Sequence, residues 1–375
     1  MTIPLNAPSL TGREEEFVLD ALRSGWITLG KYVTRFETEF AAWVGRKRAV
    51  ACSSGTSALW LALMALRLPA GQRVVTGVYS CDALANAALN ATGLPPVVVD
   101  VEPETWGADA DLMSAALRED REREDPQIGA VVLPHTYGVM ARDTAKIEAL
   151  CRGLGLPLIE DASEAHGAKL PDGRMAGSIG TVSVLSLRGE KVLGAGQFGV
   201  CVTDDADLAR RIHQYAYNGL PVDRIRFWST VPGMNCQPSH LNAALACAQL
   251  ERADELIALR NAVHAGWVER LGQYDGLTFQ TPYGIPAWWL TGIRIGRAFT
   301  GMLVQDLARG LEERDVGTRP AFYPLNRLPH VGGTESTPVA DALLMDLLIL
   351  PSGPAITGGQ QDEIVAAIMQ ITGRA

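Results

Sequence analysis

Short runs of β-branched and aliphatic residues alternate with longer segments of helical character through the first half of this 375-residue chain. The runs lie at 73–76, 96–100, 130–133, 157–160, 181–185 and 198–202. Such alternation is typical of βαβ units, because parallel strands need a crossover connection that is usually a helix. The pattern therefore predicts an α/β fold around a mostly parallel central sheet.

Two further stretches predict long helices. Residues 57–66 are too numerous and too apolar for a strand, and the small residues of 53–56 form a turn at the start of this helix. A second stretch continues as one helix through 241–259 and beyond. We expect it to link a large domain, residues 1–250, to a small C-terminal α/β domain, residues 251–375. The N-terminal segment is an exception, because it can pack on the small domain instead.

Composition excludes several classes of protein. A hydrophobic content of 47% and a charged content of 20% are those of a globular chain with a large core. A net charge of −9 argues against a broad nucleic-acid surface, which needs clustered positive charge. The six cysteines show no C-x-x-C pair and no clustering with histidine, so neither a metal site nor a disulfide framework is expected. Without a leader pattern or a membrane-spanning apolar stretch, we expect a cytoplasmic protein with no membrane partner.

A carboxylate and a lysine follow two of the predicted strands. Asp161 comes directly after the run at 157–160, at the edge where parallel sheets form ligand crevices. Lys191 follows the strand at 181–185. On spacing alone an ordinary ion pair is the more common explanation. A pyridoxal-phosphate (PLP) enzyme, however, needs a lysine amine, an acidic partner for the ring nitrogen and an anion cradle for the phosphate. The turn at 53–56 supplies such a cradle at a helix start, although most turns of this kind are plain helix caps.

The order of motifs resembles the DegT/DnrJ/EryC/StrS family of sugar-nucleotide aminotransferases, within the fold-type I PLP enzymes, over nearly the whole chain. The motifs that carry the resemblance lie at 24–28, 35–37, 54–56, 160–167, 186–191, 233–237 and 318–325. Several motifs in one order are far more specific than any one of them. The resemblance implies a mostly parallel central sheet with helices on both faces and a smaller C-terminal α/β domain.

The resemblance also implies a role for individual residues. Lys191 would hold PLP as a Schiff base and then move the proton during conversion to pyridoxamine phosphate, while Asp161 keeps the ring nitrogen protonated. Glu164 stands where the family contacts the ring hydroxyl. The phosphate would be held by Gly55, Thr56, Ser186 and, from the neighbouring subunit, Asn235. Because Asn235 would reach the site of the neighbouring subunit, the resemblance implies a homodimer with shared active sites.

Several positions depart from the family pattern. Cys81 stands where an aromatic residue commonly stacks on the cofactor, and Tyr79 lies two residues earlier, so Cys81 is assigned to the ring with Tyr79 as the alternative. Gln237 and Asn326 replace an arginine and a histidine that are usual in relatives, which we expect to alter substrate preference. His166 is interpreted as a packed structural residue rather than a general base.

We therefore expect a PLP-dependent aminotransferase. By resemblance, the donor is an amino acid, glutamate by family expectation, and the acceptor is a keto group of a nucleotide-linked deoxy-sugar. The motif at 318–325 and Glu164 look most like the perosamine-forming branch, which acts on GDP-4-keto-6-deoxymannose. A keto-cyclitol or another keto-sugar of antibiotic assembly is the alternative substrate. A PLP-free regulatory or binding protein is the alternative from another class, and a dehydratase is disfavoured because those relatives replace the lysine that stands here as Lys191.

Overall fold

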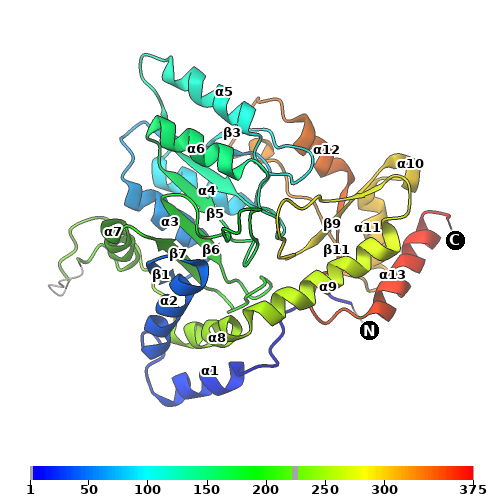
Figure 1. The fold of residues 1–375 in the computed structure, drawn as a ribbon, viewed down its shortest axis with the longest axis horizontal. Coiled ribbons are helices and arrows are strands. Elements are labelled where there is room, and N and C mark those ends of the chain that lie inside the picture. The colour runs from blue at the N-terminus through cyan, green and yellow to red at the C-terminus, as the bar shows by residue number, and fades with distance from the viewer. Residues whose placement is uncertain (1–2, 222–226, 375) are drawn as a thin grey trace.

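The computed structural model describes residues 3–221 and 227–374 (Figure 1). Its larger sheet has seven strands in the order β1-β7-β6-β5-β4-β2-β3. These strands are β1 (Arg48–Cys52), β2 (Arg73–Gly77), β3 (Val97–Val99), β4 (Ile128–Pro134), β5 (Leu158–Asp161), β6 (Val182–Ser186) and β7 (Gly199–Thr203). Strands β2 to β6 run parallel, whereas β7 is antiparallel to both β6 and β1. The predicted α/β fold is confirmed, and each predicted run overlaps a strand; only β1 was not expected.

Helices cover both faces of this sheet (Figure 1). Because successive residues of a strand point to opposite faces, Val131 of β4 belongs to one core and Val132 to the other. The first core includes helices α1 (Glu14–Arg23), α2 (Lys31–Val44), α5 (Ala110–Arg121), α6 (Thr144–Leu154) and α8 (His240–Glu251). The second includes α3 (Gly55–Leu66), α4 (Asp82–Thr92) and α7 (Ala206–Ala216). Burial on both faces explains why the strands appear in the sequence as short continuous apolar runs.

A second, antiparallel sheet has the strand order β10-β11-β9-β8. Its strands are β8 (Leu277–Phe279), β9 (Thr291–Ile295), β10 (Arg319–Pro320) and β11 (Leu347–Leu350). Its core is shared with α9 (Ala253–Leu271), α10 (Arg297–Thr300), α11 (Val304–Glu312) and α13 (Gly358–Ile371). Two short elements, η1 (Leu325–Arg327) and α12 (Pro338–Asp346), connect β10 to β11. The N-terminal Ile3 bridges to Val316 beside this sheet. The domain boundary near residue 250 stays a prediction.

The expected single helix from 241 onward is divided in two. Helix α8 ends at Glu251 and α9 begins at Ala253, because Arg252 leaves helical geometry with φ −120° and ψ 26°. Its guanidinium contacts Glu14 of α1 at 3.4 Å and Glu255 at 2.6 Å. No glycine or proline marks this break, so a local sequence pattern gives no sign of it.

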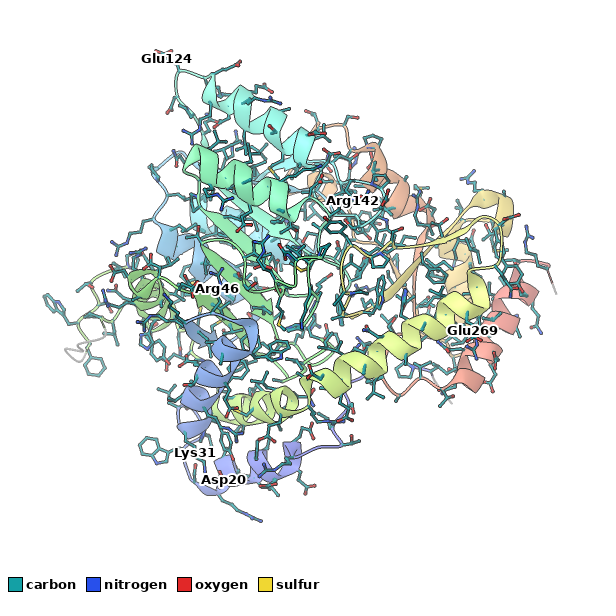
Figure 2. The ribbon with its side chains drawn as sticks, viewed as in Figure 1. Asp20, Lys31, Arg46, Glu124, Arg142 and Glu269 are labelled. Carbon is teal, nitrogen blue, oxygen red and sulfur yellow. The ribbon has the colours of Figure 1, made fainter. Side chains whose placement is uncertain are left out.

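Charged side chains lie mainly at the periphery of the molecule, as Asp20, Lys31, Glu124 and Glu269 do in Figure 2. Asp20 and Lys31, for example, form an exposed ion pair at 2.7 Å. Within the described residues, no helix combines the length and the apolar character needed to cross a membrane. The buried charges are the exceptions, and several of them gather at one edge of the large sheet.

Candidate active site

A cavity of about 250 Å³ lies at the carboxyl ends of the parallel strands, with walls from both sheets. The start of α3, the loop after β2, the ends of β5 and β6 and the loop after β6 line one side. Residues from the second region of the chain, Trp289, Arg319 and Phe322, line the other side. Of the predicted site residues, the cavity brings together Gly55, Thr56, Cys81, Asp161, Glu164, Ser186 and Lys191, but not Asn235.

Lys191 is almost enclosed. Its side chain is 9% exposed, and its Nζ lies 3.3 Å from Oε1 of Glu164 and 3.2 Å from the ring centroid of Trp289. The indole N–H of Trp289 donates to the carbonyl of Glu190 at 2.7 Å, which fixes the ring beside the lysine. The amine is therefore held between a carboxylate and an aromatic face.

Glu164 is held from behind by the backbone of Tyr137. The Tyr137 N–H donates to Oε2 of Glu164 at 3.1 Å, and Tyr137 has a φ of +57°, which bulky residues rarely adopt. The Tyr137 ring stacks on Phe322 with centroids 5.3 Å apart, and its hydroxyl lies 2.9 Å from that of Tyr79. A strained backbone conformation of this kind persists where the surrounding packing holds it in place. The aromatic cluster thus positions the carboxylate that contacts Lys191.

Asp161 ends β5 and is 8% exposed. Its Oδ1 accepts a hydrogen bond from the Ser163 N–H at 3.1 Å, and no cation pairs with it among the residues that the structure describes. Burial, the largest cause, raises the pKa of Asp161 above its ordinary value. A protonated ring nitrogen would supply the missing partner, so this carboxylate fits the pyridinium of PLP.

The start of α3 forms the third part of the site. Ser54 caps the helix by accepting from the Ser57 N–H at 3.1 Å, while the first N–H groups of any helix lack partners within it. A Cβ on Gly55 would lie 2.4 Å from Cβ of Ser186, so only glycine lets the helix approach β6 this closely. Helix N–H groups and the Ser186 hydroxyl therefore face one small space that suits a phosphate.

Cys81 lies on the cavity wall, whereas Tyr79 does not. Tyr79 is 1% exposed and faces Tyr137 and Trp106 behind the site. Burial raises the pKa of the Cys81 thiol to about 12, so the thiol stays neutral. The assignment of Cys81 to the cofactor ring stays a prediction, but its place in the structure is compatible with it.

The remaining predicted positions lie outside the cavity of the single chain. Asn235 is exposed and pairs with Tyr217 through a backbone bridge. Asn326 is 3% exposed, and its amide donates to the carbonyl of Glu335 at 3.0 Å, so it holds a loop. His166 is fully buried, and burial lowers its pKa to about 3, which leaves it neutral.

Arg260 is a buried residue that sequence reasoning missed. It lies on α9 with 2% exposure and donates to the carbonyls of Lys191 at 3.1 Å, Glu190 at 3.3 Å and Trp289 at 3.1 Å. It also donates to Oδ1 of Asn6 at 3.1 Å. Burial lowers its pKa to about 10. Arginines inside long helices are common on surfaces, so only tertiary contacts distinguish this one.

The fold and the cavity define an α/β enzyme with a lysine, a buried carboxylate and an anion cradle in one site. A family model described as the DegT/DnrJ/EryC1/StrS aminotransferase family matches residues 8–369. The chain is 32% identical over 376 residues to a GDP-perosamine synthase of Caulobacter vibrioides, covering 98% of both chains. The chain belongs to the DegT/DnrJ/EryC1/StrS aminotransferase family.

Solved structures of similar proteins have the same fold. The aminotransferase TlmJ from Streptoalloteichus hindustanus superposes with a TM-score of 0.89 at 28% identity, covering 100% of this chain and 99% of that one. An Escherichia coli GDP-4-keto-6-deoxy-D-mannose-3-dehydratase, solved with bound hydrated PLP, shares the fold at 21% identity. Its TM-score is 0.87, with 98% of this chain and 99% of that chain covered. The predicted family, fold class and aminotransferase activity are confirmed.

Proposed function

We propose that this protein uses PLP to transfer an amino group from an amino acid, glutamate by family expectation, to a keto group of a nucleotide-linked deoxy-sugar. The observation that carries the proposal is the meeting of Lys191, Asp161 and the Gly55–Ser186 cradle in one cavity. The relative named GDP-perosamine synthase supports GDP-4-keto-6-deoxymannose as the acceptor.

Each residue has a distinct task in this proposal. Lys191 would hold PLP, which would supply an electron sink for removal of the donor's α-proton. Asp161 keeps the ring nitrogen protonated, because a buried carboxylate favours a cation beside it. Gly55, Thr56 and Ser186 hold the phosphate through N–H and hydroxyl groups. These contacts fix the ring relative to the two catalytic side chains.

Lys191 also acts as the general base and acid. Its Nζ would take the proton from the α-carbon of the donor and deliver it to the C4′ atom of the cofactor. Glu164 accepts a hydrogen bond from this Nζ at 3.3 Å, and Trp289 covers it, so the amine is directed into the cavity and shielded from water. Cys81 lies on the cavity wall, and we assign it to contact with the ring of the cofactor.

We further propose a homodimer in which Asn235 completes the partner's phosphate cradle. Asn235 is exposed and lies outside the cavity of its own chain, beside Met234, which is 52% exposed. Trp228, in the same connection between α7 and α8, is 61% exposed. Large apolar side chains in the open are typical of an interface. A symmetric dimer would bury them and bring Asn235 to the second site.

Subunit mixing tests the shared site. Lys191→Ala and Asn235→Ala chains should each be inactive as homodimers, and activity should return when they are mixed, because one site of the mixed dimer is then intact. If Asn235 acts within its own chain, every site carries one lesion. A mixture that stays inactive after verified subunit exchange contradicts the shared site.

The substrate is tested by a screen of keto-sugar nucleotides with L-glutamate, read by product mass. We expect a mass change that corresponds to replacement of a carbonyl oxygen by an amine on GDP-4-keto-6-deoxymannose. A keto-cyclitol belongs in the same screen as the alternative acceptor. Purified protein with no visible absorbance after incubation with PLP, and no product with any acceptor, would contradict the proposal.

A further inference from the structure

The peptide bond that precedes Lys191 is held by side chains from distant parts of the chain. The carbonyl of this peptide bond belongs to Glu190, and it accepts hydrogen bonds from the Asn6 amide at 2.6 Å and from the Trp289 indole at 2.7 Å. A third donor, Arg260, lies farther away, at 3.3 Å. A carbonyl oxygen has two lone pairs, so the two shorter bonds take its main acceptor positions. They fix the orientation of the peptide bond.

The main chain is fixed on the other side of Lys191 as well. The Lys191 N–H donates to the carbonyl of Arg188 at 2.8 Å, and the Lys191 carbonyl accepts from Arg260 at 3.1 Å. The Trp289 ring that donates to Glu190 also covers the Lys191 amine, with Nζ 3.2 Å from the ring centroid. One carbonyl therefore orients both the backbone of the lysine and the ring beside its amine.

Asn6 is itself held in a single orientation. The carbonyl of Leu5, the preceding residue, accepts from the Ser352 N–H at 2.7 Å, just after β11. Oδ1 of Asn6 accepts from the guanidinium of Arg260 at 3.1 Å, so the acceptor end of the amide faces a group that only donates. Its donor end faces a carbonyl, which only accepts. Reversal of the amide would break both hydrogen bonds.

A second bridge joins the N-terminal segment to the loop that follows Lys191. Gln249 of α8 is 1% exposed, its Oε1 accepts from the Gly194 N–H at 3.2 Å, and its Nε2 donates to the carbonyl of Ser9 at 2.9 Å. The segment is thus connected before the lysine through Asn6 and after it through Gln249. Neither side chain lines the cavity, so an effect on the reaction has to pass through the main chain around Lys191.

We propose that Asn6 is a positioning residue for Lys191. The inference rests on the proposed function, because it assumes that the Lys191 amine holds PLP and moves protons. A rotation of the peptide bond before Lys191 displaces the long side chain that starts at the next Cα. The hydrogen bond from Asn6 opposes this rotation and keeps Nζ beside Glu164, at 3.3 Å, and over Trp289.

Asn6→Ala tests the proposal in the PLP-loaded enzyme. We expect kcat to fall by about 10- to 30-fold, because a displacement of about 1 Å in a reacting group slows a reaction by up to about 100-fold. The KM for glutamate should stay within about twofold, because Asn6 contacts no ligand in the cavity.

Two further measurements need no turnover. Cofactor-free Asn6→Ala protein mixed with PLP should form the Schiff-base absorbance about 10-fold more slowly than the wild type, because the amine is less well placed. The visible circular dichroism of the bound cofactor should also change, since this signal depends on how the ring is oriented in the site. A loss of general stability alone would move neither signal.

Asn6→Asp separates the two hydrogen bonds of the amide. The carboxylate has nearly the same size and keeps an acceptor for Arg260, but it has no donor for the carbonyl of Glu190. We therefore expect kcat and Schiff-base formation to fall as far as in Asn6→Ala.

Gln361→Ala is the matched control. Gln361 lies on α13 with 4% exposure and donates to the carbonyl of Val263 in α9 at 2.8 Å, so its loss removes a comparable hydrogen bond away from Lys191. The substitution should lower the melting temperature at least as much as Asn6→Ala does. Its kcat and its rate of Schiff-base formation should stay within about twofold of the wild type.

Three results would overturn the inference. One is an Asn6→Ala variant with wild-type kcat and Schiff-base formation, and another is an Asn6→Asp variant that keeps both. The third is a loss of rate in Gln361→Ala as large as in Asn6→Ala, which would reduce Asn6 to a contribution to stability. Wild-type protein that forms no Schiff base with PLP would instead refute the proposed function, and the inference with it.

Discussion

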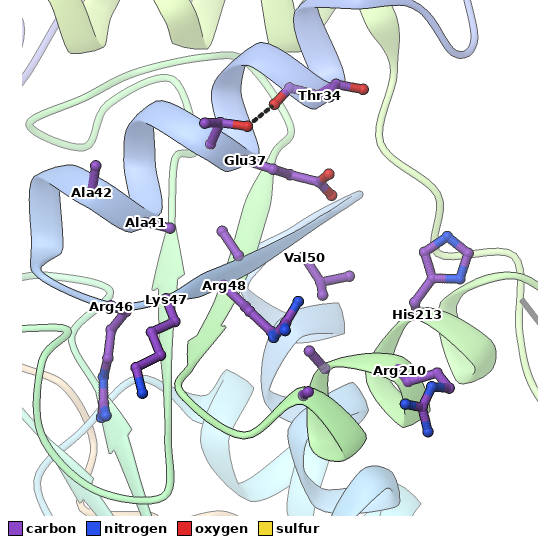
Figure 3. A pocket seen from close by; sticks show the side chains of 14 residues that line it. Thr34, Glu37, Ala41, Ala42, Arg46, Lys47, Arg48, Val50, Arg210 and His213 are labelled. Carbon is purple, nitrogen blue, oxygen red and sulfur yellow. Dashed lines mark hydrogen bonds between the residues drawn. The ribbon is translucent and has the colours of Figure 1, made fainter.

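Two hollows of the molecule, a cleft at the first strand and the cavity around Lys191, differ in a way that volume does not reveal. A cleft of about 600 Å³ lies between α2, β1 and α7 (Figure 3), more than twice the volume of the cavity around Lys191. Its basic residues come from two short parts of the chain and face solvent or acidic neighbours. Arg46 pairs with Asp204 at 2.9 Å, and Arg210 pairs with Asp207 at 2.8 Å.

The cavity around Lys191 is smaller, but Asp161, Glu164 and Lys191 are buried in it, and its lining residues come from segments spread between residues 54 and 322. Burial of an ionised group costs several kcal/mol unless a partner compensates it. Asp161 and Arg319 lack such partners within the described residues, whereas the cations of the cleft either have them or are hydrated. The cleft also holds one buried carboxylate, Glu37. The gathering of several buried charged groups from distant segments, rather than size, therefore distinguishes the cavity that we propose as the catalytic site.

The strongest test of this contrast removes the lysine of the cavity. Lys191→Ala should lower kcat/KM by about 10,000-fold or more, because both the covalent attachment and the proton transfer are lost. Borohydride reduction of the wild type followed by peptide mapping should place the cofactor on Lys191. An adduct on Lys47, which lies in the cleft, or on Lys31, Lys146 or Lys169, would contradict the assignment.

Asp161→Asn should have the next largest effect. The amide cannot stabilise a protonated ring nitrogen, so we expect amino transfer to fall by about 100- to 1000-fold while the phosphate cradle still binds cofactor. Steady-state kinetics and absorbance of the bound cofactor measure the two parts separately. Near-normal turnover in this variant would remove Asp161 from the mechanism.

Arg260→Met tests whether the segment of Lys191 is held from α9. Loss of the guanidinium leaves the carbonyls of Lys191 and Trp289 without this donor, and we expect the unfolding free energy to drop by about 3 kcal/mol. Arg270→Met, on the same helix, removes a pair with exposed Asp362 and should cost less than about 1 kcal/mol. Denaturant unfolding compares the two. Equal costs would mean that Arg260 has no special structural role.

Glu37 gives the cleft a pH dependence. Its Oε1 accepts from the Ala51 N–H at 2.9 Å, and burial raises its pKa from 4.5 to about 7. The unfolded chain therefore loses this proton near pH 4.5 while the folded chain keeps it to about pH 7. Stability falls as pH rises through that window, by about 3 kcal/mol.

Glu37→Gln removes this titration. Relative to the wild type, the variant should gain stability between pH 5 and pH 8, and its kcat at pH 7 should stay within about twofold because Glu37 does not line the catalytic cavity. Chemical unfolding at both pH values gives the difference. A difference that is the same at pH 5 and pH 8 would show that Glu37 is not the titrating group.

The smallest effect is expected from the basic side chains of the cleft. Arg48→Gln should change kcat/KM by less than about twofold and unfolding free energy by less than about 0.5 kcal/mol, because exposed charges contribute little. Steady-state kinetics and thermal melting measure both. A loss of activity above tenfold would show that the cleft takes part in the reaction and would break the contrast with the cavity.

Much of the catalytic cavity could be predicted from the sequence, for a geometric reason. Parallel strands place their carboxyl ends on one edge, so Asp161 at the end of β5 and Ser186 at the end of β6 had to lie close together once the strands were recognised. Gly55 was predictable from its place at a helix start. Cys81, rather than Tyr79, lines the cavity because Tyr79 packs into the aromatic cluster behind it.

Other features could not be predicted, because no local pattern encodes them. The break at Arg252 depends on Glu14, a residue far away in the chain. The antiparallel edge strand β1 pairs with β7, about 150 residues later, and its five residues resemble many loops. Asn235 lies outside the cavity of its own chain, and the role that we propose for it depends on a second copy.

The sequence by itself therefore determined the α/β fold, the family and the residues that follow strands of the large sheet, because strand and helix periodicity and strand-end position are local properties. Only the tertiary structure decided which residues close the site. Trp289 and Arg260 contact Lys191, and Arg319 contacts Trp289, because the second sheet and α9 pack against the carboxyl edge of the first. That packing is set by the burial of apolar surface between distant segments, which carries no periodic signal in the chain.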